Sequence, residues 1–391
     1  AHVHCVIVGF HAEGRPAALN TEETERRGEE EPPCLRPSFI SALSESKPLP
    51  KVIYDADGTP CAARNINGYL LDAPNVFVEN RTQPLCDVPR MDFGNMPNDG
   101  GNLLLSPDER NEVLAQEPSL ASVIRPFVGA TEFINRKTRY CFWLRDATPS
   151  FMRTSPILRK RIESVRVLRL ASTAEATRRK ADVPHLFFHI SHPDTPYLLV
   201  PSTSSENRRY IPIGFMDGKT IASNLVLIVP NATLFNFGVL TSSVHMAWIR
   251  AIGGRMKSDY RYSNKIVYNN FPWPEGISPR NTRKPASRDT EHTEDGTDLP
   301  CVQCAAGGGF SVFCGRITAT AQGIIDARAR YPDASFADLY DETFMPPDLR
   351  AAHTANDRAV LAAYGLRPDT PEPEIVAHLF RLYAEKVKEQ T

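Results

Sequence analysis

The sequence of 391 residues lacks several features that define common classes of protein. No apolar run approaches the roughly 20 residues needed to span a bilayer, and the first residues lack the basic, apolar and small-residue regions of a secretory signal. The eight cysteines are scattered along the chain, so they do not make the dense disulfide framework of a small secreted domain. We therefore expect a cytoplasmic protein with reduced thiols and no membrane partner.

Motifs that would mark a catalytic or metal centre are also missing. There is no Gly-x-Ser-x-Gly nucleophile elbow, and the glycine-rich stretch at residues 94–101 does not end in the Gly-Lys-Ser/Thr of a phosphate loop. Cys301, Cys304, Cys314 and His292 could supply four zinc ligands, but the second pair has the wrong spacing, and a disordered insertion is the favoured interpretation. The sequence thus predicts no catalytic residue, no cofactor-binding residue and no metal ligand in this chain.

The chain has almost no net charge, with 45 Lys plus Arg against 46 Asp plus Glu, but this balance hides opposed blocks. Residues 1–120 carry 10 basic and 19 acidic side chains, residues 121–285 carry 25 and 10, and residues 286–391 carry 10 and 17. The net charges of the three blocks are −9, +15 and −7. A positive surface of domain size attracts phosphate backbones by counterion release, so the central block predicts a nucleic-acid partner.

The N-terminal part of the sequence begins with a strand pattern. Residues 2–10 (HVHCVIVGF) form a largely β-branched apolar run ended by glycine, which is typical of a strand buried on both faces of a parallel or mixed sheet. No βαβ series follows, so we interpret this strand as the end of a domain whose larger part lies outside the chain. The alternative is a solitary strand that joins a later sheet. Residues 11–50 are acidic and rich in proline, and they predict a loop.

The central block mixes helical and strand patterns. Ser106 is the expected N-cap of a short helix, and from Pro156 onward apolar residues repeat at helical spacing while basic residues, Arg169 among them, fill the other positions. Strands are expected at residues 186–188, 197–200 and 225–229, and a helix is expected from Val239 to Ile252. The fold class is therefore α+β, and the 33 prolines argue against a helical bundle.

The C-terminal part separates into two regions. Residues 276–316 change abruptly to Pro, Ser, Thr, Arg, Asp and Gly, which predicts a linker or insertion. After it, residues 317–331, 346–364 and 372–388 are expected to form three helices, the last of them with a clear apolar stripe. Such a helical tail more often docks onto a neighbouring domain than carries chemistry.

Two segments of the basic block interleave charge with aromatic and amide side chains, namely residues 204–210 (SSENRRY) and 255–265 (RMKSDYRYSNK). Arginine reads guanine with two hydrogen bonds, asparagine reads adenine, and lysine or serine holds phosphates. Charge patterning alone leaves an alternative equally open, a solvated cationic face with buried tyrosines. The candidate DNA-contacting residues are Arg208, Arg209, Arg255, Lys257, Tyr260, Arg261, Tyr262, Asn264 and Lys265.

Five longer motifs carry a resemblance to a known family. They are residues 93–103 (FGNMPNDGGNL), 210–215 (YIPIGF), 240–248 (LTSSVHMAW), 257–263 (KSDYRYS) and 268–274 (YNNFPWP). On these motifs the chain resembles the C-terminal half of the MmeI-like DNA methyltransferases, which are type IIL restriction-modification enzymes and their relatives. The resemblance covers about residues 1–275 and again 317–388.

The resemblance implies a division of labour along the chain. In that family a nuclease and a helical spacer precede a class I methyltransferase that binds S-adenosylmethionine and methylates adenine N6. Residues 1–66 would hold the end of that methyltransferase, a Rossmann-like remnant strand and the acidic loop. Residues 67–275 would form a mixed α/β target recognition domain, residues 276–316 a linker or insertion, and residues 317–391 a small helical C-terminal domain.

The catalytic motifs of the family are not found in this chain. The Asn-Pro-Pro-Tyr/Phe motif that holds the flipped adenine is missing, and so is a glycine-rich cofactor loop after a strand. S-adenosylmethionine is therefore expected in the intact enzyme and no cofactor in this chain. Residues 11–50 and 276–316 depart from the family pattern, so we exclude them from the functional site.

The expected function is sequence-specific recognition of double-stranded DNA. It would be carried out as part of a site-specific adenine-N6 methyltransferase of restriction-modification or phage-defence type, with the missing methyltransferase domain as a partner. The alternative is a protein-interaction module whose basic face docks onto a partner domain.

Overall fold

The computed structural model describes residues 51–54, 58–274 and 308–390, with side chains from residue 312 onward in the last range. The chain divides into two compact units, one ending at Val76 and the other beginning at Phe77, and each is described by itself. The strand predicted at residues 2–10, the acidic stretch and most of the predicted linker lie outside the described residues. In the described ranges, no helix is both long and apolar enough to cross a membrane.

The smaller unit contains an antiparallel hairpin. Strand β1 (Lys51–Tyr54) pairs with β2 (Pro60–Ala63). In the loop that follows, Asp72 Oδ1 accepts hydrogen bonds from the backbone N–H groups of Arg64 and Asn65, at 3.0 and 2.9 Å. This carboxylate therefore holds the chain in a turn after the hairpin.

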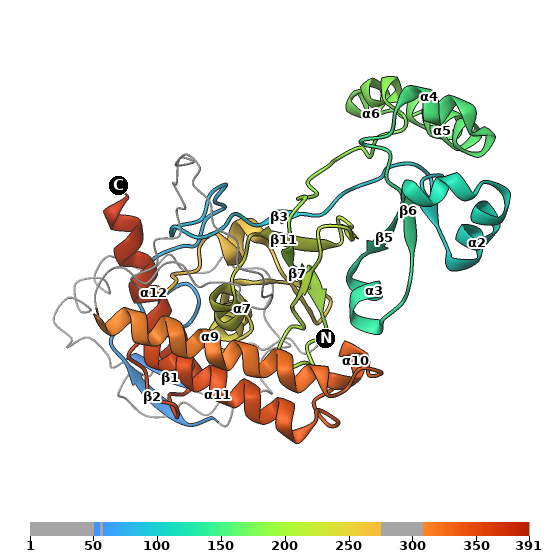
Figure 1. The fold of residues 1–391 in the computed structure, drawn as a ribbon. Coiled ribbons are helices and arrows are strands. Elements are labelled where there is room, and N and C mark those ends of the chain that lie inside the picture. Colours follow the sequence, from blue (N-terminus) through green and yellow to red (C-terminus); the bar gives the residue numbers. More distant parts are fainter. Residues whose placement is uncertain (1–50, 55–57, 275–307, 391) are drawn as a thin grey trace, which may run out of the picture. The chain divides into compact units, whose positions relative to one another are not determined.

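The described part of the larger unit contains small sheets surrounded by helices (Figure 1). Its strands are β3 (Asp92–Phe93), β4 (Leu104–Leu105), β5 (Ile124–Val128), β6 (Tyr140–Phe142), β7 (Tyr197–Pro201), β8 (Thr203–Ser204), β9 (Gly214–Met216), β10 (Ile221–Ala222), β11 (Val226–Pro230), β12 (Gly254–Met256) and β13 (Asp259–Arg261). One sheet has the order β10-β5-β6-β4, a second β3-β11-β7-β9 and a third β12-β13-β8.

The helices of the larger unit lie before, between and after these strands. They are α2 (Pro107–Gln116), α3 (Ala130–Asn135), α4 (Pro149–Thr154), α5 (Pro156–Leu170), α6 (Glu175–Arg179), α7 (Leu234–Leu240), α8 (Ser243–Ile252), α9 (Gly308–Ala329), α10 (Phe336–Leu339), α11 (Pro347–Ala363) and α12 (Glu372–Glu389). Shorter turns are the 3₁₀ segments η1 (Pro118–Ser122) and η2 (Lys180–Asp182) and the π-helical turn η3 (Asn264–Tyr268).

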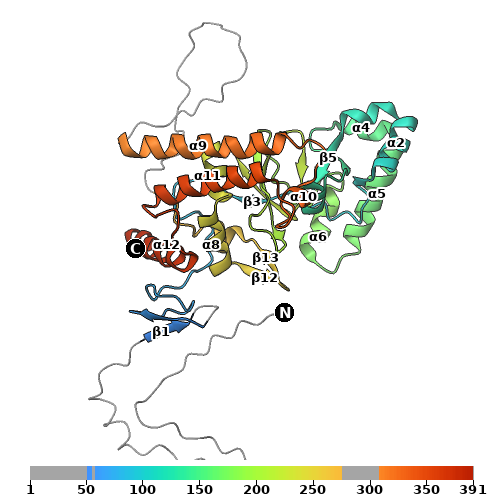
Figure 2. The same ribbon diagram turned by 90° about the horizontal axis from the view of Figure 1, so that it is seen from below.

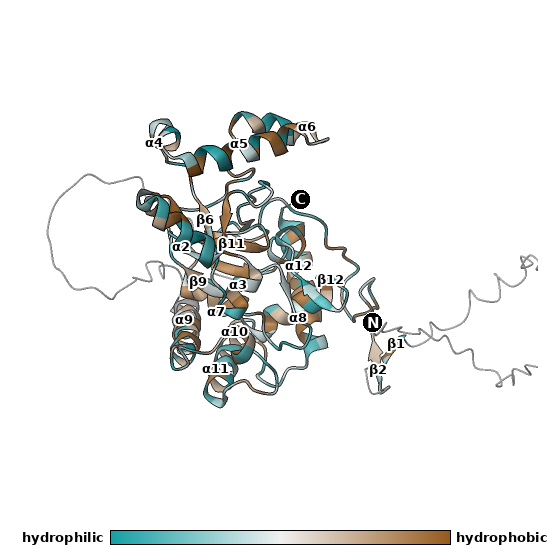
Figure 3. Cartoon of the chain, turned by 90° about the vertical axis from the view of Figure 1, so that its right-hand side faces the viewer, coloured by the Kyte–Doolittle hydropathy of each residue, from teal (hydrophilic) through white to brown (hydrophobic). Residues whose placement is uncertain are grey.

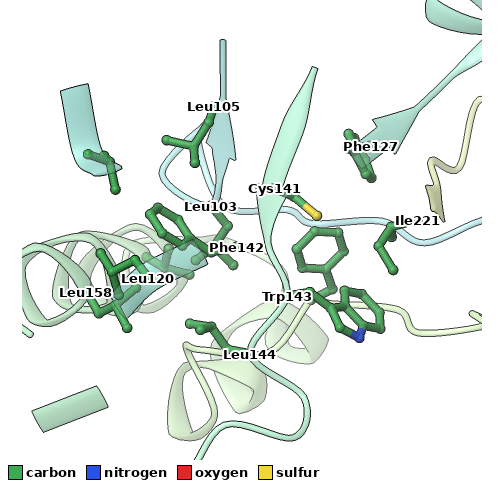
Figure 4. Packing of buried hydrophobic residues seen from close by; sticks show 13 residues of the cluster. Leu103, Leu105, Leu120, Phe127, Cys141, Phe142, Trp143, Leu144, Leu158 and Ile221 are labelled. Carbon is green, nitrogen blue, oxygen red and sulfur yellow. The ribbon is translucent and has the colours of Figure 1, made fainter. Parts of the chain in front are cut away.

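An apolar core joins the first sheet to its helices. It includes Leu120, Phe142 and Leu158, which have no exposed surface (Figure 4). Ser106 caps helix α2 by accepting from the N–H of Glu109 at 3.1 Å, and the Glu109 carboxylate accepts from the Ser106 N–H at 2.8 Å. This reciprocal capping box confirms the predicted start of the helix.

Helix α5 has mixed hydropathy along its length, as Figure 3 shows, but one of its basic residues faces inward. Arg169 has no exposed surface, and it donates hydrogen bonds to five backbone carbonyls. The acceptors are Pro97, Asn98, Lys180, Val183 and Leu186. The expectation that Arg169 lies on the polar face of the helix is therefore wrong, because its guanidinium is buried against the carbonyls of the surrounding loops.

A buried amide ties the chain after β3 to strand β10 and to the loop before β7. Asn95 is fully buried, and its Nδ2 donates to the carbonyl of Ala222 at 2.8 Å. Its Oδ1 accepts from the N–H groups of Ser191 and His192, at 2.9 and 3.0 Å. A side chain at the preceding Gly94 would lie 2.2 Å from the Ser223 carbonyl oxygen. Glycine is required there because two backbone segments approach so closely.

The C-terminal helices pack against α7 and α8. Helices α9 and α11 lie side by side (Figure 2), and both contact α7. On α12, the ring of Phe380 lies 5.3 Å from that of Trp248 on α8. The side chain of Asn356 donates to the carbonyl of Gly238 at 2.8 Å. The helical tail is therefore part of the same packed body as the strands that precede it.

The α+β fold class is confirmed, with mixed strands and helices followed by a helical C-terminal region. Helices expected at residues 346–364 and 372–388 are present as α11 and α12. The helix expected from residue 317 begins earlier, at Gly308, so it extends into the segment predicted as a linker. The strands expected at residues 197–200 and 225–229 are present as β7 and β11.

Two local predictions are wrong. Residues 186–188 do not form a strand, because their backbone groups bond instead to Val183, to Pro97 and to the buried guanidinium. The single helix expected from Val239 to Ile252 is broken into α7 and α8. Ser242 begins the second helix by accepting from the N–H of His245 at 3.3 Å.

Candidate nucleic-acid interface

The third sheet brings together the two basic segments that the sequence singles out. In the ladder between β8 and β13, Tyr260 pairs with Ser204 and Arg261 pairs with Thr203. The N–H of Glu206 in the following loop donates to Asp259 Oδ1 at 3.3 Å. Residues 203–209 and 254–265 thus form one continuous surface, which we call the basic hairpin surface.

The end of helix α8 sets the course of the hairpin. A side chain at Gly253 would lie 2.4 Å from the carbonyl oxygen of Ile249, so only glycine allows the chain to leave the helix at this angle. Strands β12 and β13 lie side by side (Figure 2). Met256 pairs with Asp259 at the end of this ladder. The two-residue turn between them has Lys257 in the left-handed region, at φ 57°. Hairpin turns of two residues favour positive φ because it matches the twist of the strands.

The predicted contact residues differ in how far they reach solvent. Five cations are exposed, namely Arg209, Arg255, Lys257, Arg261 and Lys265. The side chains of Arg208 and Asn264 are half-buried, and those of Tyr260 and Tyr262 are buried. The structure therefore brings the nine residues into one region but presents mainly the cations outward.

Several of these arginines are held in place by their neighbours. The guanidinium of Arg255 lies 4.1 Å from the ring centroid of Tyr260, and its Nη1 donates to the Ser258 carbonyl at 3.2 Å. Nη1 of Arg261 donates to Thr203 Oγ1 at 3.1 Å. Such contacts reduce the conformational freedom that a cation loses when it binds a phosphate or a base.

Arg208 lies in a more enclosed position than the other cations. Burial lowers the pKa of its guanidinium, while the carboxylates of Asp259 and Asp341 act in the opposite direction. The backbone N–H of Arg208 donates to the carbonyl of Ser205 at 3.2 Å, which closes a turn in the loop after β8. The residue remains charged because an arginine pKa starts far above neutrality.

Tyr262 links the hairpin to helix α8 through a buried hydrogen bond. Its hydroxyl lies 2.8 Å from Nε2 of His245, and both side chains are buried. Burial lowers the pKa of His245 to about 3 and raises that of Tyr262, so both groups are neutral near pH 7. A buried ring cannot read a base edge, so the contribution of Tyr262, and equally of Tyr260, is to hold the hairpin against α8.

A second buried contact supports the loop that carries Arg208 and Arg209. The hydroxyl of the next residue, Tyr210, donates to Asp357 Oδ2 at 2.6 Å, and Asp357 Oδ1 accepts from the N–H of Ser243 at 2.7 Å. Burial raises the pKa of the Asp357 carboxyl. This residue belongs to α11, so a C-terminal helix fixes the base of the loop.

Sequence reasoning missed the roles of Thr203, Met256 and Asp357. Alternation of side chains along residues 254–261 could have placed Met256 on the face of Arg261, but Thr203 gave no such signal because its pairing with Arg261 depends on the fold. Asp357 gave no such signal, since its partners lie far away in the chain. Of the four residues considered for zinc, only Cys314 is described, and Cys301, Cys304 and His292 lie outside the described residues.

Comparisons with known proteins agree with this architecture. Residues 72–275 match the family described as "MmeI, target recognition domain", and residues 314–390 match "MmeI, C-terminal domain". The chain is 35% identical over 330 residues to DNA methyltransferase A of Bacillus subtilis (strain 168), covering 84% of this chain and 34% of that protein. It is also similar to the solved structure of the type IIL restriction-modification enzyme MmeI in complex with DNA, with 39% identity and a TM-score of 0.73.

The structural match covers 88% of this chain and 42% of the MmeI chain, so the chain spans less than half the length of either relative. The target recognition match alone covers more than half of this chain. The resemblance inferred from the five sequence motifs is confirmed. The chain belongs to the MmeI family and contains the target recognition and C-terminal regions of that family.

Proposed function

We propose that this chain reads the sequence of double-stranded DNA as the target recognition part of a site-specific adenine-N6 DNA methyltransferase of restriction-modification or phage-defence type. The observation that carries the proposal is the basic hairpin surface. Two cationic segments distant in sequence form one rigid surface, and five of its cations are exposed. Phosphates bind such cations, and arginine side chains also read guanine in the major groove.

The proposal assigns different roles to the residues of this surface. Lys257 and Lys265 contact phosphates, while Arg208, Arg209, Arg255 and Arg261 contact phosphates or base edges. Asn264 shapes the base of the hairpin by donating to the carbonyl of Met91 at 3.3 Å. The recognition domain extends over residues 67–275, and the protein works in the cytoplasm.

S-adenosylmethionine belongs to the other part of the proposed enzyme. A side chain at Gly100, in the glycine-rich turn, would lie 2.4 Å from Leu168 Cδ1, so helix α5 fills the space beside that turn. The Asp99 carboxylate already accepts from the N–H groups of Gly101 and Leu103. These residues do not fit a cofactor cradle, and methyl transfer requires the methyltransferase domain as a partner.

Salt-dependent binding tests the DNA-reading role. The affinity of the full chain for a duplex of about 30 base pairs should fall linearly with salt on logarithmic axes. Lys257→Ala and Arg261→Ala should each reduce the slope by about 0.9 for every phosphate that the removed side chain neutralises. Arg316→Ala, which removes an exposed cation from α9, is the matched control and should leave the slope unchanged.

A wild-type chain whose binding shows no salt slope would contradict DNA recognition, and it would favour a protein partner for the basic face. The adenine-N6 assignment needs a separate measurement. Nucleoside mass spectrometry of DNA exposed to the intact enzyme and S-adenosylmethionine should detect N6-methyladenine. The purified chain alone should transfer no methyl group, and transfer by it would contradict the assigned division of labour.

A further inference from the structure

Phosphate binding does not explain every residue of the basic hairpin surface. Met256 is 50% exposed, and it lies between two exposed cations, Arg255 and Lys257. Moving an exposed apolar side chain from water onto an apolar surface is favourable. A thioether also cannot bind a phosphate. What sets Met256 apart from other exposed apolar side chains is its place between two exposed cations, where a bound duplex would lie against it.

Strand register places Met256 on a defined face of the hairpin. The pairs in the ladder are Gly254 with Arg261, Arg255 with Tyr260, and Met256 with Asp259. Because side chains alternate between the two faces of a sheet, Met256 shares its face with Arg261, while Arg255 and Tyr260 lie on the other. Gly254 has no side chain, and its missing Cβ would lie 3.8 Å from that of Arg261.

The acidic residue opposite Met256 does not repel phosphates strongly. Asp259 accepts a hydrogen bond from the N–H of Glu206, and its charge is close enough to influence Arg208. The Asp259 carboxylate is thus partly compensated by groups of the protein. Around Met256 the three cations Arg208, Arg209 and Arg261 outnumber the two carboxylates Glu206 and Asp259.

Backbone geometry and hydrogen bonds hold the hairpin at both of its ends. Lys257 adopts φ 57°, a conformation that costs energy for a residue other than glycine and persists where its surroundings enforce it. Arg255 braces the turn through the Ser258 carbonyl. At the other end, the Tyr262 N–H donates to the Ser202 carbonyl at 2.9 Å. The protein thus holds an apolar side chain outward on a fixed support.

We propose that Met256 enters a groove of duplex DNA and contacts the apolar surface of the bases, while Arg261 and Lys257 hold the flanking backbone. This inference rests on the proposed function. The apolar surfaces that a duplex offers are the thymine methyl groups in the major groove and the base faces at an opened step. Methionine suits both because its flexible, polarisable side chain adapts to irregular surfaces.

The main experiment compares Met256→Ala with wild type in the full chain. With a duplex of about 30 base pairs, the dissociation constant should rise about fivefold because the apolar side chain no longer meets the bases. The salt slope should stay unchanged, because methionine neutralises no phosphate. Met256→Leu should retain most of the affinity. Val312→Ala, at an exposed apolar position of α9, is the control and should bind as wild type.

Two further duplexes distinguish the kinds of base surface. If Met256 enters a base step, 2-aminopurine placed at successive positions should brighten at one of them with wild type and not with Met256→Ala. If it contacts thymine methyl groups, replacing thymine by uracil should weaken wild type about as much as Met256→Ala does. Equal affinity of Met256→Ala and wild type for every duplex would overturn the inference. An absent salt slope in wild type would instead overturn the proposed function on which it rests.

Discussion

At the scale of single residues, charge in the sequence does not reveal whether a side chain meets solvent. Arg166 and Arg169 lie on the same helix and have the same side chain. Arg166 is exposed and lies 3.9 Å from Glu163, whereas Arg169 is buried and donates only to backbone carbonyls among the bonds described. A count of basic residues therefore overestimates the charge available for DNA on α5.

We expect Arg169→Leu to destabilise the larger unit by about 3–5 kcal/mol, because five carbonyls each lose the hydrogen bond that the buried guanidinium donates. Arg166→Leu should change the free energy of unfolding by about 0.5 kcal/mol or less, since the exposed ion pair contributes little. Urea unfolding followed by circular dichroism measures both. Equal stability of the two variants would contradict the structural role of Arg169.

His245 should make stability depend on pH. Its folded pKa of about 3 lies below the unfolded value of about 6.5, so the unfolded chain takes up the proton first as the pH falls. The contribution of His245 is therefore complete above about pH 6.5 and is lost toward pH 3, by up to about 1.4 kcal/mol per pH unit. His245→Gln should flatten the fall of the unfolding free energy between pH 7 and pH 4.

The matched variant for this prediction is Tyr262→Phe. It removes the hydroxyl partner but keeps His245 buried, so the dependence on pH should persist. Urea unfolding at several pH values gives the slopes. Identical slopes for wild type and His245→Gln would show that His245 does not titrate on unfolding.

At the scale of elements, two glycines on facing helices should respond in opposite ways to alanine. At Gly238 on α7 a Cβ would lie 2.8 Å from Ile317 Cγ2 and 3.1 Å from Ala321 Cβ. Gly238→Ala should therefore cost about 1–3 kcal/mol through overpacking. Gly323 on α9 has open space, so Gly323→Ala should stabilise the protein by about 0.5–1 kcal/mol. In thermal unfolding, Gly238→Ala should lower the melting temperature and Gly323→Ala should raise it.

The sequence predicts best those elements whose determining residues lie within the element itself. Helix α2 has its cap and acidic first turn within a few residues, and α12 has a complete apolar stripe. The strand predicted at residues 186–188 is absent because an apolar run forms a strand only where another strand is available to pair with it. The candidate site shows the same limit. Composition predicted the cations, but the pairing of β8 with β13 that joins them depends on the whole fold.

At the scale of the whole molecule, the C-terminal helices complete the structure that holds the basic hairpin surface. Tyr364 at the end of α11 donates to the Pro272 carbonyl at 2.9 Å. On α12, Glu372 accepts two hydrogen bonds from Arg250, at 2.6 and 2.7 Å. The sequence separated these regions into two domains with opposite net charge. In the structure, α7 and α8 of the first region pack against the C-terminal helices of the second.

We therefore expect a chain that ends at residue 274 to lose the native packing of α7 and α8. Trp248 would no longer pack against Phe380, and the loop at Tyr210 would lose its bond to Asp357. Burial of large apolar side chains supplies about 1.5–3 kcal/mol each, so the loss of several exceeds the stability of a typical domain. Amide hydrogen exchange should show unprotected backbone in α7 and α8, and residues 308–391 added as a separate chain should restore protection. Native protection in the truncated chain alone would mean that the recognition region folds without its helical partner.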